Sequence, residues 1–389
     1  MNYGLPRASV ASRAFLAFVL FTCGFGTTGL AATNSTDSVA YQINALHDGA
    51  TTASLGMPLH VRWSVPVVGN ISYPLIADGL VFTTFGTTLI AINARSGHTA
   101  WIQTIQYGWV GAAFGDDRIF AVGISSQGAY MYAFDARSGS QIWATSLEAT
   151  GNYSFTSPPT TRNGSVYTVG AGGIGTLFAI RTSDGKLLWH VSAGGDDTSA
   201  AVTDKDVYVA FACPQVYDLK PANGATIWHY DGGCHGGGGS VPVVDRGLVY
   251  AEDDMTGMHN GIVLNKDTGA LFGHFDSTYP MAFSQGIAFA VQFGGSNLTA
   301  MTSRNGKLLW SIPANTNDGF DVPPIVDSNI GLVFEGTIQG LLNAYKVSSG
   351  KLAMSFNLGS GVAFGTAMAI GDHMVVLEAG NQLVALSDH

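Results

Sequence analysis

The chain has 389 residues, of which 46% are hydrophobic, only 11% are charged and 51 are glycine. So few charged residues exclude a helical bundle or a coiled coil, and the apolar content excludes a disordered chain. The net charge of −10, without a basic tract, excludes nucleic acid as the partner. The many Gly, Val, Thr and aromatic residues instead favour an all-β protein with many tight turns.

Residues 1–32 have the pattern of a secretory signal peptide. Arg7 and Arg13 supply positive charge, the run 14–21 is apolar but too short to span a bilayer, and small residues follow. The bulky residues before Cys23 argue against a lipid-attachment signal there. No other apolar stretch approaches about 20 residues, so we expect a secreted or periplasmic protein without a membrane span.

From residue 60 onward, one pattern recurs: an apolar-alternating strand, a turn ending in Gly, and a second strand usually begun by Trp, as in Met131–Trp143. The turn glycines recur about every 42 residues, a spacing typical of propeller blades. They are Gly97, Gly139, Gly185, Gly224, Gly269, Gly306 and Gly350. Four residues later stand Trp101, Trp143, Trp189, Trp228, Gly273, Trp310 and Met354. We predict that the glycines supply a positive φ to the turn and that the tryptophans pack between repeats.

A second polar turn precedes each copy, so each unit holds four short strands, as a propeller blade does. The last unit stops at Leu383–Ser387, and the strand that it lacks stands at the front as His60–Val65, with Trp63. We therefore predict an eight-bladed, all-β propeller of four-stranded antiparallel blades over 60–389, closed by the N-terminal strand, behind a leader at 33–59. Removing 33–68 is expected to destabilise the protein far more than removing 33–50.

The loops between the second and third strands of each blade, and the links between blades, should meet at one mouth of the central channel. The residues expected there are Tyr73, Trp109, Phe155, Ser199, His235, Ser240, Tyr279, Asp321 and Phe364. Their aromatic rings either stack a planar ligand or a sugar, or seal the hub against water.

Two cysteines fall on the same rim. Once a signal peptide is removed, Cys213 and Cys234 are an even pair in an exported chain, which favours a disulfide over a metal site. The alternative is a pair of free buried thiols.

Acidic residues also gather on this rim. Glu252, Asp253 and Asp254, together with Glu335 and Glu378, offer the hard oxygen ligands that Ca²⁺ prefers. Because the loop lacks the spacing of an EF-hand, a solvated acidic edge is the alternative.

The segment from Ala133-Phe134-Asp135 to Trp143 is a close copy of the Ala-x-Asp-x-x-x-Gly-x-x-x-Trp signature. On this motif the sequence resembles secreted PQQ-binding-like β-propeller repeat proteins, over essentially the whole mature chain. Two groups share that propeller. Quinoprotein alcohol dehydrogenases imply catalysis with PQQ and calcium, and the outer-membrane assembly propeller lipoprotein implies scaffolding between proteins. The adjacent Cys-Cys pair that stacks on the cofactor in the dehydrogenases is missing here.

One propeller fold hosts many functions. We expect an exported, monomeric, non-catalytic binding or scaffold module without an assigned cofactor, whose partner is a protein or a glycan. The alternative is a small PQQ-dependent oxidoreductase, with PQQ at the channel mouth, Ca²⁺ on the rim carboxylates, and Asp321 or Glu252 as the base. Carboxylates and aromatic rings converging in one pocket would favour the enzyme, and scatter around the rim would favour the binding module.

Overall fold

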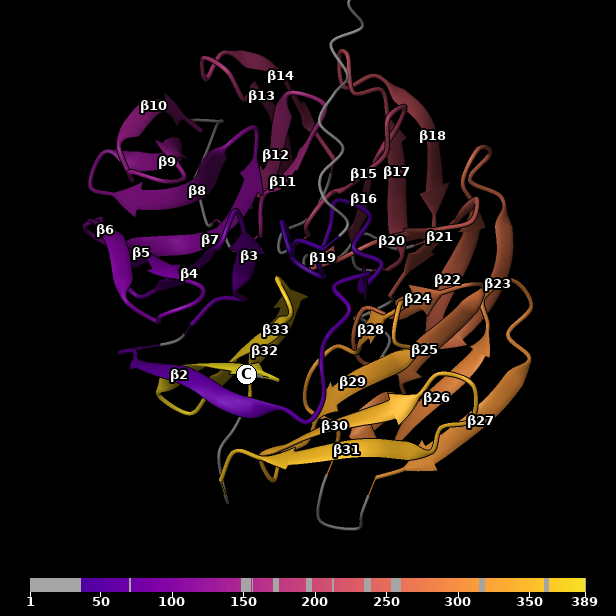
Figure 1. The fold of residues 1–389 in the computed structure, drawn as a ribbon. Coiled ribbons are helices and arrows are strands. Elements are labelled where there is room, and N and C mark those ends of the chain that lie inside the picture. Colours follow the sequence, from indigo (N-terminus) through magenta and orange to yellow (C-terminus); the bar gives the residue numbers. More distant parts are fainter. Residues whose placement is uncertain are drawn as a thin grey trace, which may run out of the picture. The chain divides into compact units, whose positions relative to one another are not determined.

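The computed structural model describes residues 36–69, 71–147, 155, 157–170, 175–193, 198–211, 213–233, 239–252, 260–314, 319–359 and 364–388. The predicted signal peptide at 1–32 lies outside these residues. In the described part of the chain, eight separate sheets surround one axis, which confirms the predicted eight-bladed, all-β propeller (Figure 1). The one helical element in these ranges is a 3-10 turn, η1 (Phe293–Gly295). No helix found there is long and apolar enough to cross a membrane.

Blades 1 to 4 follow one another along the chain, and each runs from its innermost to its outermost strand. Blade 1 holds β3 (Leu75–Ala77), β4 (Leu80–Phe85), β5 (Thr88–Asn93) and β6 (Thr99–Thr104). Blade 2 holds β7 (Gly108–Gly115), β8 (Arg118–Ser125), β9 (Gly128–Asp135) and β10 (Gln141–Ser146). Blade 3 holds β11 (Thr160–Arg162), β12 (Ser165–Gly170), β13 (Thr176–Arg181) and β14 (Leu187–Ser192). Blade 4 holds β15 (Ala201–Val202), β16 (Val207–Phe211), β17 (Gln215–Leu219) and β18 (Thr226–Asp231), and β19 (Gly239–Ser240) also pairs with β16.

Blades 5 to 8 continue in the same order. Blade 5 holds β20 (Val243–Asp245), β21 (Leu248–Ala251), β22 (Asn260–Asn265) and β23 (Leu271–Asp276). Blade 6 holds β24 (Ala282–Ser284), β25 (Ile287–Val291), β26 (Asn297–Thr302) and β27 (Leu308–Pro313). Blade 7 holds β28 (Ile325–Asp327), β29 (Leu332–Gly336), β30 (Leu341–Lys346) and β31 (Leu352–Asn357). Blade 8 holds β32 (Phe364–Gly371), β33 (Met374–Ala379), β34 (Gln382–Ser387) and, outermost, β2 (His60–Pro66).

The strand β2 closes the ring. It pairs antiparallel with β34 near the other end of the chain, and Trp63 lies opposite Ala385. The predicted closure by the N-terminal strand is therefore confirmed. Because β2 and β34 cover each other's open edge, the two ends of the chain complete one blade together.

The repeated tryptophans join blades at six of the eight interfaces of the ring. Each indole lies on the turn glycine of the following blade, where an added Cβ would stand 2.6–2.9 Å from a Trp side chain. Each indole Nε1–H also donates a hydrogen bond of 2.7–2.9 Å to the carbonyl three residues before that glycine. The pairs are Trp63 with Ala94, Trp101 with Ala136, Trp143 with Thr182, Trp189 with Pro221, Trp228 with Lys266 and Trp310 with Val347. The turn glycines have φ between 64° and 73°, so both predicted roles are confirmed.

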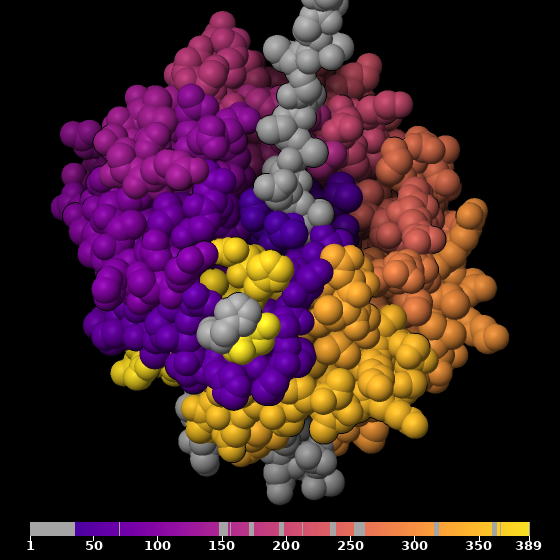
Figure 2. Space-filling model, in the orientation of Figure 1, coloured from indigo at the N-terminus to yellow at the C-terminus, as the bar shows by residue number. Residues whose placement is uncertain are grey.

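The described part of the leader is 36–59, and its first half lies in the hub of the ring, where its indigo ribbon crosses the middle of Figure 1. Its short strand β1 (Ala50–Thr51) pairs parallel with β28 of blade 7. Its other hydrogen bonds, of 2.6–3.2 Å, reach the innermost strand of each remaining blade. They join Ser38 to Ile76 and Ile370, Val39 to Phe114, His47 to Thr160, Ala45 to Val202, Leu46 to Val244 and Asp48 to Phe283. The leader therefore contacts all eight blades, and its indigo atoms fill the middle of the face shown in Figure 2.

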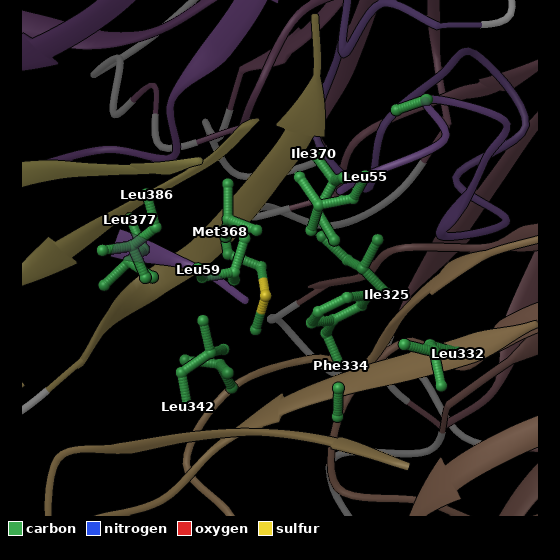
Figure 3. Close-up of a cluster of buried hydrophobic side chains, with 14 of the residues drawn as sticks. Leu55, Leu59, Ile325, Leu332, Phe334, Leu342, Met368, Ile370, Leu377 and Leu386 are labelled. Atoms are coloured by element: carbon green, nitrogen blue, oxygen red, sulfur yellow. The ribbon is translucent and has the colours of Figure 1, made fainter. Parts of the chain in front are cut away.

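The last part of the leader fills the interface between blades 7 and 8. Leu55 and Leu59 pack in one buried cluster with Ile325, Phe334 and Met368 (Figure 3). Met354, which replaces the repeated Trp in blade 7, packs against the same cluster. Here the leader supplies apolar volume at an interface that lacks an indole.

His47 is the buried ionisable group at the centre of the leader. Its side chain is 0% exposed, with Nδ1 3.2 Å from the Pro242 carbonyl and Nε2 3.2 Å from the Thr160 hydroxyl. Burial lowers the pKa of His47 to about 4, so the imidazole is neutral in the folded protein at neutral pH. Protonation of this group is therefore linked to unfolding.

These contacts change the expectation for the leader. Deleting 33–50 removes hydrogen bonds to every blade, each with a net contribution of about 1 kcal/mol. We expect this truncation to lower the free energy of unfolding by on the order of 5 kcal/mol, a substantial part of the loss expected for 33–68. Denaturant unfolding of both truncations and of the mature chain measures this. A 33–50 truncation as stable as the mature chain would contradict the assigned role of the leader.

The neutral His47 predicts a dependence of stability on pH. The pKa of His47 is lowered on folding. Its contribution to the free energy of unfolding is therefore complete above pH 6.5 and is lost as the pH falls toward 4. Between pH 7 and 5 this loss amounts to about 2 kcal/mol. His47→Gln should remove this loss, so that on going from pH 7 to 5 the unfolding free energy of the variant changes by about 2 kcal/mol less in the destabilising direction than that of the wild type. His98→Gln, in an exposed turn, is the matched control, and equal pH slopes for wild type and His47→Gln would contradict the prediction.

Candidate functional site

The ring has two distinct faces. The turns after the first and third strands of a blade lie together, since Ala94 N–H bonds the Gly79 carbonyl at 3.0 Å, and we call this side the turn face. The loops between second and third strands and the links between blades form the opposite side, the link face. The leader lies toward the turn face, where Asn329 donates to the Thr52 carbonyl at 2.8 Å. The predicted rim residues belong to the link face.

Tyr41 of the leader lies at the hub below the link face. It is partly buried, and its ring meets the edge of Tyr73 at a centroid distance of 5.3 Å. The Tyr73 hydroxyl donates a hydrogen bond of 2.6 Å to the Ala112 carbonyl, which fixes that ring. Burial raises the pKa of Tyr41, and the nearby groups of Glu252 and Tyr279 raise it further. Tyr41 and Tyr73 therefore form a packed pair of rings at the hub, which we call the tyrosine floor.

Beside this floor lies a group of acidic residues and a tyrosine that we call the hub acid cluster: Tyr279, Asp321 and Glu335. Asp321 is fixed by its N–H, which donates to the Gly336 carbonyl at 2.9 Å. Glu335 is 0% exposed, and the Val322 N–H donates to its Oε1 at 3.4 Å. Its Oε2 is buried and has no hydrogen-bond partner among the described residues.

Burial controls the charge of this cluster. It raises the pKa of Glu335 well above its ordinary value, an effect that the Val322 N–H opposes and the neighbouring Asp321 reinforces. Burial, with Asp321 and Glu335 nearby, raises the pKa of Tyr279 to about 12. Burial alone raises the pKa of Glu378, on β33, to about 7. A buried carboxyl group with a raised pKa can stay protonated near neutral pH and donate a hydrogen bond.

Three of the predicted rim residues lie close together here. Tyr279 and Asp321 belong to the cluster, and the backbone N–H of Phe364 bonds the Asp321 carboxyl group. A fourth, Tyr73, packs on Tyr41 of the leader. The Phe364 ring also packs closely on Gly336, because a Cβ added to this glycine would stand 3.0 Å from the ring.

The other predicted rim residues lie in or between blades. Trp109 packs edge-on against Tyr132 and Phe134, at centroid distances of 5.4 and 5.8 Å. Phe155 is buried beside Phe178. The Ser199 hydroxyl donates to the Pro158 carbonyl at 2.8 Å and also lies 3.3 Å from Nε2 of His47 in the leader. The Ser240 carbonyl accepts from the Thr198 hydroxyl at 2.7 Å. His235 lies outside the described residues.

Tyr41 is the residue of this site that the sequence did not reveal. The leader has no counterpart in the repeats, so no periodicity places it. The leader backbone is also unusual, with φ of 51° at Gln42 and 76° at Ile43, a region that β-branched residues rarely adopt. The surrounding hub holds this conformation, and only the folded ring creates that environment.

The described residues do not fit a calcium-bound quinone. Among them, no three His, Cys, Asp or Glu side chains are placed to hold a metal ion, and Asp253 and Asp254 lie outside this part of the chain. We therefore derive no step through PQQ.

Only one of the two cysteines of the predicted disulfide lies in the described part of the chain. Cys213 is 4% exposed, with φ of 71°, where the chain turns between β16 and β17. Cys234 lies outside the described residues, so the pairing stays a prediction.

Comparison with known proteins agrees with this architecture. The family model described as "Outer membrane protein assembly factor BamB" matches residues 86–251 and 196–334. The tetrathionate hydrolase of Acidithiobacillus ferrooxidans is 24% identical over 94% of this chain and 62% of its own length. The assembly factor BamB of Salmonella typhimurium is 25% identical over 63% of this chain and 67% of its own length. This chain thus spans about two thirds of these two relatives.

A solved structure shows the same fold. The quinohemoprotein alcohol dehydrogenase from Comamonas testosteroni superimposes with a TM-score of 0.71 at 13% identity, covering 92% of this chain and 81% of that one. At this identity the likeness concerns the fold alone. The family match over most of the repeats is the stronger finding: the chain belongs to the PQQ-like repeat β-propeller family described by the outer-membrane assembly factor BamB.

Proposed function

We propose that this chain is an exported, non-catalytic scaffold of the cell envelope that binds a partner protein on its link face. The observation that carries the proposal is the exposure of large apolar side chains there. Val68 is 85% exposed and Tyr107 is 62% exposed, in the two links that flank blade 1. Exposed apolar groups that lie close together on a soluble protein are typical of interaction sites.

These two side chains stand on neighbouring loops. Gly86, in the loop between β4 and β5 of blade 1, lies close to both links. Its carbonyl accepts the Trp109 N–H at 3.0 Å, and a Cβ added to Gly86 would stand 3.9 Å from the Val68 carbonyl oxygen. Ile338, in blade 7, is 45% exposed on the same face, and its N–H bonds the Gly319 carbonyl at 2.9 Å. Loops tied to one another in this way form a preformed surface, which limits the entropy lost on binding.

The relatives support this choice of partner. The name of the BamB relatives describes them as outer membrane protein assembly factors. Export to the envelope is part of the proposal and rests on the pattern of residues 1–32. A glycan is the competing partner, and a Tyr107 crosslink to a glycan in place of a protein would favour it.

Photo-crosslinking tests the link face directly. A photoreactive phenylalanine analogue in place of Tyr107 should give a discrete crosslink to a protein in the native cell envelope, because this side chain lies in the proposed interface. The same analogue in place of Ile142, which is 44% exposed on the outer strand β10, is the matched control. Val68→Ser should weaken the Tyr107 crosslink. Equal crosslinking at both positions, or none at Tyr107, would contradict the proposal.

A second candidate function rests on Glu335. A buried carboxyl group with one unpartnered oxygen, beside Asp321 and Tyr279, is a plausible general acid, and the tetrathionate hydrolase relative aligns over 94% of this chain. In this case the hub acid cluster, and not the link-face side chains, would carry the function.

An activity assay separates the two candidates. As a scaffold, the purified mature chain should not turn over tetrathionate and should not bind PQQ saturably, with or without Ca²⁺. Glu335→Gln should shift the melting temperature by only a few degrees, since an amide resembles a protonated carboxyl group in size and polarity. Turnover of tetrathionate that disappears in Glu335→Gln would replace the scaffold proposal with the hydrolase.

A further inference from the structure

The interface between blades 5 and 6 lacks the indole that joins the other repeats. Gly273 stands where six blades have Trp, and the glycine that it should cover is Gly306 of blade 6. At the six Trp-covered glycines, an added Cβ would meet an indole within 2.9 Å, whereas at Gly306 it would meet no atom within 4 Å. The chain therefore keeps the glycine turn of the interface without the side chain that occupies it elsewhere.

A cavity remains at this place, on the turn face and away from the hub acid cluster. Its volume is about 350 Å³, and Tyr250, Phe275, Met281 and Met301 supply most of its apolar wall. Arg304, Asn305 and His274 lie along its polar edge. An apolar cavity of about 150 Å³ is already large enough to hold a benzene ring. This cavity can therefore hold a two-ring aromatic molecule.

The hydrogen-bond acceptor for an indole is also in place. The Ser303 carbonyl, three residues before Gly306, corresponds to the carbonyls that accept the Trp Nε1–H in the other blades. It already accepts the Tyr250 hydroxyl at 2.6 Å. The equivalent carbonyl of Lys266 accepts both the Tyr208 hydroxyl, at 3.3 Å, and Trp228 Nε1, at 2.9 Å. The same carbonyl position can thus take a tyrosine and an indole together.

The other interface without a repeated Trp is filled from within the chain. Between blades 7 and 8, Leu55 and Leu59 of the leader lie in one buried cluster (Figure 3). Met354 packs against that cluster. Between blades 5 and 6, Phe275 and Val263 lie beside Gly273, and the cavity persists in spite of them.

We propose that the cavity between blades 5 and 6 is a binding site for a small planar aromatic molecule with a ring N–H, of the indole type. The ring lies between Tyr250 and Gly306, its N–H donates to the Ser303 carbonyl, and polar substituents point toward Arg304. The repeat itself defines this ligand, because six copies of the fold hold an indole in the equivalent place. The site is independent of the scaffold function proposed for the link face.

Calorimetric titration of the mature chain with indole tests the proposal. We expect saturable binding of one indole per chain. Benzothiophene has nearly the same shape but no N–H donor, and it should bind about five-fold more weakly because one hydrogen bond is lost. Equal affinity for both compounds would overturn the role of the Ser303 carbonyl.

Two variants provide matched controls. Gly273→Trp restores the repeat residue and should abolish binding, while Trp310→Gly opens the corresponding space between blades 6 and 7 and should add a second indole per chain. Should Gly273→Trp fail to fold, Val263→Phe fills the same cavity from the neighbouring strand, since Val263 faces Gly273. No saturable binding up to the solubility of indole, or unchanged binding in the filled variant, would overturn the proposal.

Discussion

The structure depends on one repeated contact, in which an indole of one blade lies on the turn glycine of the next. The contact needs glycine for two reasons: the turn has a positive φ, and a side chain there would occupy the space of the ring. The Nε1–H bond then fixes how the indole meets the next blade, because the accepting carbonyl belongs to the same turn. A sheet of four strands cannot cover its own faces, and at six of the eight interfaces this contact packs one blade on the next.

The leader accepts hydrogen bonds from backbone N–H groups that the innermost strands of the blades leave unpaired. The innermost strands expose N–H groups toward the channel, and Phe114, Val202, Val244 and Phe283 donate theirs to leader carbonyls. Because an unpaired buried N–H is costly, these bonds explain how a segment without regular structure becomes ordered in the hub. The two faces of the ring therefore differ. The leader fills the hub toward the turn face, whereas the hub acid cluster lies toward the link face.

The repeats, the blade number and the closing strand could be predicted because each leaves a local pattern of glycine, tryptophan and alternating apolar residues. The place of Tyr41 could not, since the leader has one copy and its contacts join residues far apart in the sequence. Trp109 shows a second limit. The pairing of β7 with β8 shifts register between Trp109 and Gly111, and such a bulge redirects a side chain in a way that alternation alone does not predict. For Glu335 the charge state follows from burial, which no short stretch of sequence encodes.

The joint construction of blade 8 from both ends of the chain has a consequence for how the protein comes apart. In an open repeat array the terminal units contact one neighbour only, and they fray first. Here, within the described residues, every blade has two neighbours, and the two ends of the chain are held in one sheet by the pairing of β2 with β34. Loss of any one blade requires the ring to open, so partial unfolding has no low-energy starting point. The rate at which the ring opens should then limit the rate at which a protease reaches the unfolded chain.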